Sequence, residues 1–517
     1  MNKLFPRHKL ILLPAITLAL TGCMVGPDFV KLEPDVPAEW SQPVEQGLQT
    51  APNELVAWWR VFDDPVLNEL VDLARKNNNT LEIAGLRVLE ARAQLGIATG
   101  LLYPQSQVAV GEATRVSPAD NTGVTSDFWQ YGLGASISWE IDFWGRFRRG
   151  IESADAAYFA SMAAYDQALI LLTASVVDGY AVVRTFEEQL RIAKENLKIQ
   201  KRSYDIAAVL YRNGAASELD MQQAETLLLA TRATIPDLEA SLKKARNALS
   251  TLLGQPPGSV KTLLAGSQGI PSLPAEIAIG FPADMLRRRP DVRQAELLAM
   301  SQNALIGLAK ADLYPSFSLT GSIGLATGGT SNSDFGDLFS SDALAFSIGP
   351  SFVWPFLNYG RLKNNLRVQD ARLQQALVNY RETVLQAARE TEDAMASFIG
   401  TREQVIILAK TVSSAQRSNQ LSTLRYQEGF ADYQRVLNAQ QALFAQQTRY
   451  TATQGNGMRN LVALYTALGG GWENREDLPF IDPETRQQMQ ERTDWGDLIE
   501  ATNSQDEAES EQRETGQ

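Results

Sequence analysis

The sequence predicts a mixed fold, in which a membrane β-barrel is joined to long coiled-coil α-helices in a chain that is a tandem structural repeat. Three observations predict this fold class. Motifs recur at a nearly constant spacing, segments of about ten residues alternate between apolar and small or polar side chains, and helical segments run for about 65 residues without a proline. We count four predicted strands per chain and expect a trimer to pool them into a 12-stranded barrel.

The two copies of the repeat lie 215 residues apart over most of their length. Residues 211–214 (YRNG) recur at 426–429 (YQEG), whereas residues 102–104 (LYP) recur at 313–315, a spacing of 211. The difference of four residues predicts an insertion in a loop upstream of Gly145. Two copies of one unit can share one architecture, so the repeat overrides an estimate of domain number from chain length.

Composition excludes several classes of function. The 517 residues carry a net charge of −13, which argues against a nucleic-acid partner. The sole histidine, His8, lies in a predicted signal segment, and the sole cysteine, Cys23, is a predicted lipidation site. The mature chain would therefore lack imidazole and free thiol, which excludes Ser-His and Cys-His nucleophiles and His or Cys zinc sites. We expect no enzyme, no metal site and no cofactor, although carboxylate-only chemistry stays formally open.

The N-terminus, residues 1–22, has the pattern of a lipoprotein signal peptide. Basic residues precede an apolar segment, 10–20, that is too short to span a bilayer as a helix. Residues 20–23 (LTGC) resemble a lipobox, in which Cys23 becomes the acylated mature N-terminus. An ordinary signal peptide followed by a free thiol is the alternative. Met24 stands where an aspartate would favour the inner membrane, so we expect the outer membrane.

The mature chain divides into five predicted parts. Residues 23–58 are rich in proline and are predicted to form a lipidated, extended tether. Repeat 1 covers 59–254, a linker covers 255–281, and repeat 2 covers 282–471. Asp64 and Pro65 predict an N-cap and a first helical position early in repeat 1. Residues 472–517 are acidic and poor in apolar side chains, so we predict a disordered tail.

Strands are predicted at about 105–141 in repeat 1 and about 316–355 in repeat 2. In each range, apolar side chains alternate with glycine, serine and other small or polar residues. Each strand has about the length of a tilted membrane strand, and Trp139, Trp144 and Trp354 suit an interfacial aromatic belt. A soluble sandwich sheet is the alternative.

Four strands cannot close a membrane barrel alone, because an open sheet edge in lipid leaves backbone groups unpaired. A dimer would supply eight strands and a trimer twelve. An eight-stranded barrel has its interior filled by side chains. The small residues on the predicted inner face favour an open bore and hence the trimer.

Each strand pair leads into a long helical segment. Gly214 and Gly429 interrupt these patterns, and we predict that each marks the tip of a helical hairpin. The return helices are predicted from about 217 to 253 and from about 432 to 468, each with a Leu-Gly C-cap. Helices of this length indicate coiled coils.

Four stretches carry a resemblance to a known family: 23–29 (CMVGPDF), 58–65 (WWRVFDDP), 286–292 (LRRRPDV) and 313–323 (LYPSFSLTGSI). They resemble the lipoprotein branch of the TolC-like outer-membrane efflux factors, with OprM- and NodT-type members. The likeness runs from Cys23 to about Gly471 and does not cover the acidic tail.

The resemblance implies a homotrimer with its β-barrel among outer-membrane lipids and an α-helical coiled-coil barrel in the periplasm. It implies a passive exit duct for drugs or other small molecules, gated at the helical tips. The partners would be a periplasmic adaptor, or membrane fusion protein, and an inner-membrane RND-type pump. Palmitate on Cys23 and a part in multidrug resistance follow from the same resemblance.

The resemblance also places a gate at the hairpin tips. Asp220 matches the acidic residue of the first repeat, and Tyr426 matches the tip tyrosine. Arg435 and Asn438 stand at two positions that are both aspartate in the TolC type. OprM-like members usually keep an acid at the second of these positions, so with Asn438 the resemblance does not imply a carboxylate ring there.

The TolC-type tip arginine is also missing, and Ala431 occupies its position. We hypothesise that Arg425 or Arg435 pairs with Asp220 instead. The alternative is that Asp220 and Arg435 are ordinary solvated charges of a coiled coil, since surface ion pairs are weak.

Other functions stay open at this point. The same fold would serve an exporter of peptides or metal ions. A structural lipoprotein that spans the periplasm without a pore is a second class, although the small inner strand face argues against it. An enzyme is the weakest option, because Glu140 and Asp142 lie two residues apart on a strand and suit a barrel rim.

Overall fold

The computed structural model describes residues 24–31, 33, 40, 48–49, 55–117, 127–267, 269–274, 277–278, 286–327, 334–473, 475 and 479–499. The predicted signal peptide and Cys23 lie outside the described residues. The chain forms two compact units, which are described separately. Unit 1 comprises Met1–Leu32, Leu89–Ala160 and Ala295–Tyr380, and unit 2 comprises Glu33–Val88, Ser161–Gln294 and Arg381–Gln517.

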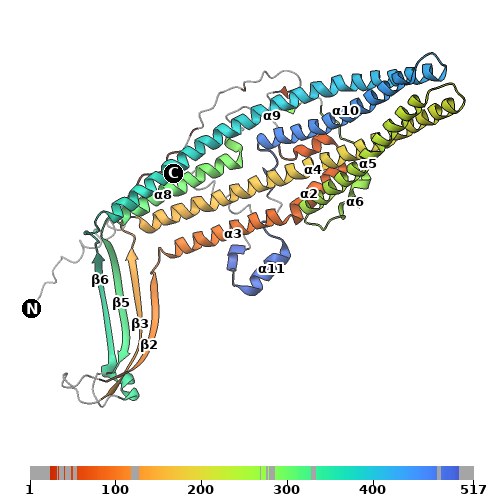
Figure 1. Ribbon diagram of the computed structural model, residues 1–517. Coiled ribbons are helices and arrows are strands. Elements are labelled where there is room, and N and C mark those ends of the chain that lie inside the picture. Colours follow the sequence, from red (N-terminus) through yellow and green to blue (C-terminus); the bar gives the residue numbers. More distant parts are fainter. Residues whose placement is uncertain are drawn as a thin grey trace, which may run out of the picture. The chain divides into compact units, whose positions relative to one another are not determined.

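Unit 1 contains an antiparallel sheet of four strands in the order β2-β3-β5-β6 (Figure 1). The strands are β2 (Ser106–Val116), β3 (Phe128–Ile141), β5 (Ser316–Ala326) and β6 (Leu344–Val353). All four lie within the predicted ranges. The pairing of β3 with β5 joins the two repeats, and it leaves β2 and β6 as the edges of the sheet.

Across β3, β5 and β6, one face of the sheet is apolar and exposed. Ala135, Ile323 and Phe346 lie directly opposite one another across β3, β5 and β6, with Leu133, Leu325 and Leu344 beside them. The Phe346 side chain is 77% exposed and Ile348 is 74% exposed. On the other face, Ser322 and Ser347 share a hydrogen bond of 2.9 Å between their hydroxyls. A soluble sandwich would bury these apolar side chains, so that alternative is wrong.

The helices confirm the tandem repeat. Helices α4 (Arg146–Arg212) and α9 (Arg361–Gln427) both have 67 residues, and α5 (Glu218–Leu252) and α10 (Tyr433–Ala467) both have 35. Each pair starts 215 positions apart, for example at 218 and 433. Helices α3 (Asn79–Gly100) and α8 (Pro290–Ala311) both have 22 residues and start 211 positions apart. The predicted change in spacing therefore lies between these helices and α4 and α9.

The insertion in repeat 2 lies in the segment between β5 and β6. Two short 3-10 helices occur there, η5 (Phe335–Phe339) and η6 (Ser341–Ala343). The Asp334 side chain and the Asp337 side chain cap η5 reciprocally. This structure accounts for the longer connection in repeat 2.

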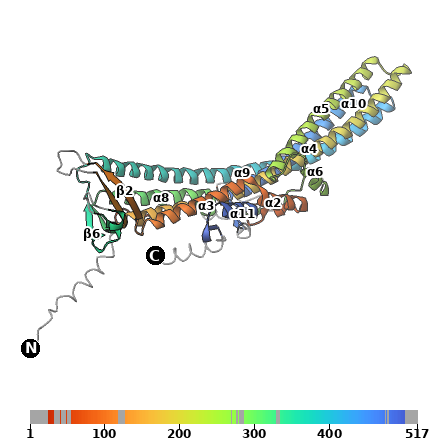
Figure 2. The same ribbon diagram turned by 90° about the horizontal axis from the view of Figure 1, so that it is seen from below.

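Unit 2 contains the ends of two helical hairpins, formed by α4 with α5 and by α9 with α10. Both views show these ends side by side (Figures 1 and 2). Among the described residues, α4 alone is long and apolar enough to cross a membrane by length and composition, yet 56% of its most apolar window is buried. Leu169, Val176 and Val177 on α4 are fully buried, which makes α4 a core helix of the bundle.

The start of repeat 1 is as predicted. Helix α2 (Pro65–Asn77) begins with proline at its first position, and the Asp64 carboxylate accepts hydrogen bonds from the Val66 and Leu67 amides. Before it lies a 3-10 helix, η2 (Trp58–Phe62), whose two tryptophans and Phe62 are buried. The Tyr180 hydroxyl on α4 donates to the same Asp64 carboxylate. One capping residue thus also attaches α2 to α4.

The linker contains some regular structure. A two-residue strand β4 (Ile277–Ala278) pairs in parallel with β1 (Leu48–Gln49) from the tether. Helix α6 (Val260–Leu263) leads directly into the 3-10 helix η4 (Leu264–Gly266). Arg184 donates to the Leu264 carbonyl at 3.0 Å, which attaches this part of the linker to α4.

The predicted disorder of 472–517 is wrong for the described part of that tail. Helix α11 (Pro483–Arg492), capped by Asp482, and the 3-10 helix η8 (Gly496–Ile499) form there. Phe480 packs edge-on against Tyr165, and the Arg475 guanidinium forms a buried ion pair of 2.8 Å with Asp166. The described part of the tail is therefore folded by a few contacts, although its average composition is polar. Residues 500–517 lie outside the described residues.

The first residues of the predicted tether are held against unit 1. The Val25 amide donates to the Trp144 carbonyl at 3.1 Å, and Asp28 forms an ion pair of 2.8 Å with the buried Arg149. Gly26 lies so close to Gly307 that a Cβ atom on Gly26 would come within 2.5 Å of the Gly307 Cα. The segment just after Cys23 is therefore a fitted part of the fold.

Candidate functional site at the hairpin tips

Gly214 and Gly429 each end the outgoing helix of a hairpin. Their φ angles are +74° and +78°, in the left-handed region that favours glycine. The Ala215 amide donates to the Leu210 carbonyl at 2.8 Å, and the Phe430 amide donates to the Arg425 carbonyl at 2.8 Å. These bonds close the last helical turn in the same way in both copies. Both predicted tip glycines thus lie at the turns.

The return helix of the first hairpin begins with a capping box. The Ser217 hydroxyl accepts from the Asp220 amide at 3.2 Å, and the Asp220 carboxylate accepts from the Ser217 amide at 3.3 Å. The predicted gate acid Asp220 thus stabilises the start of its own helix. Its half-buried side chain also lies near enough to act electrostatically on two tyrosines of the second hairpin.

The second hairpin has a different arrangement at the equivalent positions. Asp432 is the N-cap residue, yet its side chain makes no capping hydrogen bond. Arg435 replaces the acid of the capping box and lies 3.8 Å from Asp432, with both side chains more than 70% exposed. Such an exposed pair contributes little. Neither Arg425 nor Arg435 pairs with Asp220 among the described residues of this chain, so the hypothesised ion pair does not form within one chain.

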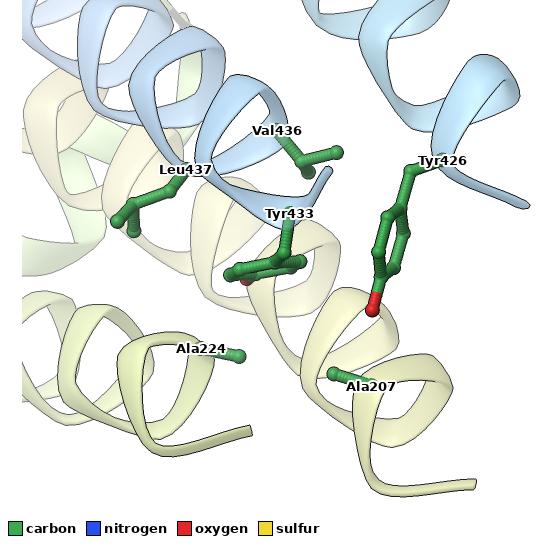
Figure 3. Packing of buried hydrophobic residues seen from close by; sticks show 6 residues of the cluster. All are labelled: Ala207, Ala224, Tyr426, Tyr433, Val436 and Leu437. Carbon is green, nitrogen blue, oxygen red and sulfur yellow. The ribbon is translucent and has the colours of Figure 1, made fainter. Parts of the chain in front are cut away.

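Tyr426 lies in an apolar cluster that joins the two hairpins (Figure 3). Its ring centre is 5.3 Å from that of Tyr433, at an angle of 68° between the planes. The cluster draws one residue or more from each of α4, α5, α9 and α10, and its members are Ala207, Ala224, Tyr426, Tyr433, Val436 and Leu437. Tyr433 is 1% exposed. We call this group the tip cluster.

The two tyrosines of the tip cluster are held in the neutral form. Burial, followed by the negative charge of Asp220, raises the pKa of Tyr426. Burial also raises the pKa of Tyr433, with smaller effects of Tyr426 and Asp220. The Tyr426 hydroxyl oxygen is buried and has no hydrogen-bond partner among the described residues. A buried hydroxyl normally donates a hydrogen bond, so this one is expected to find its acceptor outside the chain.

Amide side chains connect the exposed side of the tips. The Gln223 amide donates to the Gln434 carbonyl oxygen at 3.4 Å, and the Gln434 amide donates to the Asn438 carbonyl oxygen at 3.0 Å. Asn438 thus contributes a neutral amide at the position where OprM-like proteins usually have an acid. Arg425 is exposed and makes no ion pair within the described residues. The contact of Gln223 with Gln434 therefore joins the two hairpin tips through neutral amides, without an ion pair between the tips among the described residues.

Polar pairs along α4 and α10, which the sequence analysis missed, hold the hairpins together. Asn196 donates to Gln447 at 2.7 Å, and Gln440 donates to Ser203 at 2.6 Å. Farther from the tips, Arg459 and Asp178 form an ion pair of 2.6 Å. Such pairs specify the register of neighbouring coiled-coil helices. Partners in α10 have falling residue numbers as the residue numbers in α4 rise, so the two helices run antiparallel.

Comparison with known proteins identifies the family of this fold. A family model described as "Outer membrane efflux protein" matches residues 70–255 and 281–470, which is one segment for each repeat. The chain belongs to this family of outer-membrane efflux channels, with a periplasmic helical domain and a position in the outer membrane. These channels are transport proteins, and the match indicates no catalytic family.

Particular relatives cover nearly the whole chain. The chain is 33% identical over 466 residues to the cation efflux system protein CusC of Escherichia coli O6:H1, with 89% of this chain and 99% of the relative covered. It is 31% identical over 470 residues to the probable outer membrane lipoprotein SilC of Salmonella typhimurium, covering 90% and 99% of the two chains. The solved structure of the outer-membrane channel OprN aligns with a TM-score of 0.80 and 32% identity, covering 87% of this chain and all of that chain.

Proposed function

We propose that this chain is the outer-membrane channel of a tripartite efflux system, a passive, gated exit duct for drugs or other small molecules. An inner-membrane RND-type pump would supply the energy, and a periplasmic adaptor would connect pump and channel. The observation that carries the proposal is the four-stranded sheet, whose apolar face is exposed. The outer edges of its two edge strands, β2 and β6, have no strand partner among the described residues.

A homotrimer follows from the need to close that sheet. In lipid, the free backbone groups of β2 and β6 require partners, and a second copy of the same chain offers both edges. Three copies supply twelve strands. The residues of the inner face are small, serines such as Ser322 and Ser347 together with glycines, and would leave a bore open to water. In a structural lipoprotein without a pore, larger side chains would be expected to fill the interior of the barrel.

The gate is proposed at the tip cluster. The buried Tyr426 hydroxyl has no acceptor within the described residues, so in the trimer it would donate to an acceptor of a neighbouring copy. Asp220 of the same chain lies close enough to raise the pKa of Tyr426 but does not accept its hydrogen bond, so we propose Asp220 of the neighbouring copy as the acceptor. Arg425, Arg435 and Asn438 would line the same opening with positive or neutral groups. Packing of Tyr433 would hold the second hairpin in the closed position.

Planar-bilayer conductance of the purified protein, with its mass measured in detergent, tests this function. We expect a trimer with small and rarely open currents. Tyr426→Phe removes the hydroxyl and keeps the ring, so conductance should rise, whereas Tyr211→Phe at the equivalent exposed position should change nothing. Asp220→Ala should also raise conductance, and Ser217→Ala controls for the lost capping box. A monomer without current would contradict the channel, and unchanged currents in both gate variants would contradict the gate.

Export of metal ions is the second candidate, and the name of the relative CusC favours it. Substrate choice in such systems lies mainly with the pump. The two candidates differ in the resistance that the channel confers with its own pump and adaptor. Loss of the channel would sensitise cells to organic drugs in the first case and to metal salts in the second.

Lipidation of Cys23 is proposed as the membrane anchor, and the likeness to SilC supports it. Residues 24–31 are fitted to unit 1, which would place the acylated cysteine beside the sheet. Labelling with radioactive palmitate should mark the wild-type chain and leave Cys23→Ser unlabelled. Label on the variant would contradict the site.

A further inference from the structure

The inner face of the sheet carries few charges. Its side chains on β3, β5 and β6 are mainly glycine, serine, threonine and alanine, as the register shows for Gly132, Ser318 and Ser351. On β2 the same face carries Ser106, Val108, Val110, Glu112 and Thr114, because these residues lie opposite the Gly, Ser and Gln positions of β3. Within the strands, Glu112 and Glu140 are the only ionisable residues on this face.

The two acids differ in whether their charge is compensated. Glu140, at the end of β3 next to α4, lies 3.3 Å from the Arg146 guanidinium. Glu112 is exposed and has no ion pair or side-chain hydrogen bond among the described residues. It lies six positions along β2 from Ser106, which is about 20 Å along an extended strand. Glu112 is therefore an uncompensated carboxylate on an otherwise neutral surface.

The backbone opposite Glu112 is shaped to accept its side chain. Glu112 pairs directly with Gly132 on β3. A Cβ atom on Gly132 would come within 2.9 Å of Glu112 Cγ and 3.1 Å of Glu112 Oε1. Glycine at this position leaves room for the side chain of Glu112, which lies across the neighbouring strand with its carboxylate beside the Gly132 backbone.

We propose that Glu112 sets the ion preference of the β-barrel, through a ring of three carboxylates in the bore that favours cations over anions. The inference rests on the proposed trimeric channel, in which the inner face lines the bore and each chain contributes one Glu112. Rings of acidic side chains are a general means of cation preference in pores. Because the carboxylates lie on the wall, the bore stays wide enough for solutes to pass.

The strength of the effect depends on salt. The Debye length is about 30 Å at 0.01 M ionic strength and about 3 Å at 1 M. In dilute salt the field of the three carboxylates therefore reaches across the bore, and in concentrated salt it does not. We expect a cation preference that is largest in dilute salt and that vanishes at 1 M.

Reversal potentials of single channels in a gradient of 0.01 M to 0.1 M KCl test the proposal. Glu112→Gln should lower the ratio of potassium to chloride permeability about threefold, and Glu112→Lys should lower it further. Glu112→Asp should keep the wild-type ratio, and Thr114→Ala, on the same face of the same strand, is the steric control. A ratio that is equal in wild type, Glu112→Gln and Glu112→Lys would overturn the proposal. Failure of every variant and of the wild type to conduct would instead contradict the proposed function.

Thiol labelling tests the placement of Glu112 independently. The only natural cysteine is Cys23, the proposed acylation site. A membrane-impermeant thiosulfonate should react with Glu112→Cys in intact cells. It should leave Ala113→Cys unreacted, because the adjacent residue lies on the apolar face opposite Tyr131. The reverse pattern would place Glu112 outside the bore and overturn the proposal.

Discussion

The two hairpin tips derive from one repeated unit, yet they treat the same tyrosine differently. Tyr211 and Tyr426 occupy equivalent positions, but Tyr211 is 38% exposed and Tyr426 is 8% exposed. Seven residues later, the first copy has the exposed Glu218 and the second has Tyr433, which is 1% exposed. The ring of Tyr433 covers Tyr426. The two copies thus have the same helices, and the difference in burial of the tip tyrosine comes from Tyr433 in the second copy.

The N-termini of the return helices α5 and α10 also differ, and here the first tip is the better stabilised of the two. The first tip keeps a full capping box of Ser217 and Asp220, while the second has an N-cap Asp432 without a capping bond and Arg435 in place of the acid. The first tip is therefore stabilised within its own backbone, and the second depends on packing against the first hairpin. A gate needs one part that stays and one part that moves, and this difference makes the second hairpin the proposed moving part.

The largest expected effect is that of Tyr433→Ala. Removal of a large, fully buried aromatic side chain should lower the local free energy of opening by about 3–5 kcal/mol. Hydrogen exchange of backbone amides near Tyr426 measures this. Glu218→Ala, at the equivalent exposed position, should stay within about 0.5 kcal/mol. Equal protection in both variants would show that Tyr433 does not hold the tip.

The second-largest expected effect is that of alkaline pH, which should destabilise the second tip. The pKa values of Tyr426 and Tyr433 are raised in the fold by burial, above about 10 for free tyrosine. The stability that this gives is fully present below about pH 10 and is lost as pH rises through the folded pKa values, because the unfolded tip ionises more easily. Bilayer conductance should therefore rise above about pH 10. Tyr433→Phe should weaken that rise, and an identical profile would contradict the assignment.

Loss of an N-cap side chain should have a smaller effect than the changes at the tyrosines. Between the two tips, the first should lose more stability than the second. Ser217→Ala removes a capping hydrogen bond and should cost about 0.5–2 kcal/mol of local stability. Asp432→Ala removes a side chain that makes no such bond and should cost clearly less. Amide exchange at the first turns of α5 and α10 compares them. A greater cost at Asp432 would reverse the proposed division between the tips.

The smallest effect is expected for Arg435→Ala. The Arg435 and Asp432 side chains are 3.8 Å apart and more than 70% exposed, so the pair should contribute at most about 0.5 kcal/mol and less in high salt. The same exchange experiment in dilute and concentrated salt measures it. A cost that persists in concentrated salt would indicate a partner for Arg435 other than Asp432.

Local patterns in the sequence predicted much of the fold. The repeat spacing of 215 residues predicted two hairpins with tips at Gly214 and Gly429, and α4 and α9 have the same length in the structure. Alternation predicted the strands, and Asp64-Pro65 predicted the start of α2. The disorder of the described tail was predicted wrongly, because average composition does not reveal that Phe480 and Arg475 have buried partners in α4.

By itself, the sequence determined the repeat, the strands, the long helices and the family likeness, because periodicity and turn residues act over a few neighbouring positions. Only the tertiary structure decided which of two equivalent tyrosines is buried, and that Asn196 and Ser203 pair with Gln447 and Gln440. It also decided that Glu112 lies over Gly132. Each of these contacts joins segments that are distant in the chain, and the burial and pairing of side chains depend on partners that no local pattern specifies.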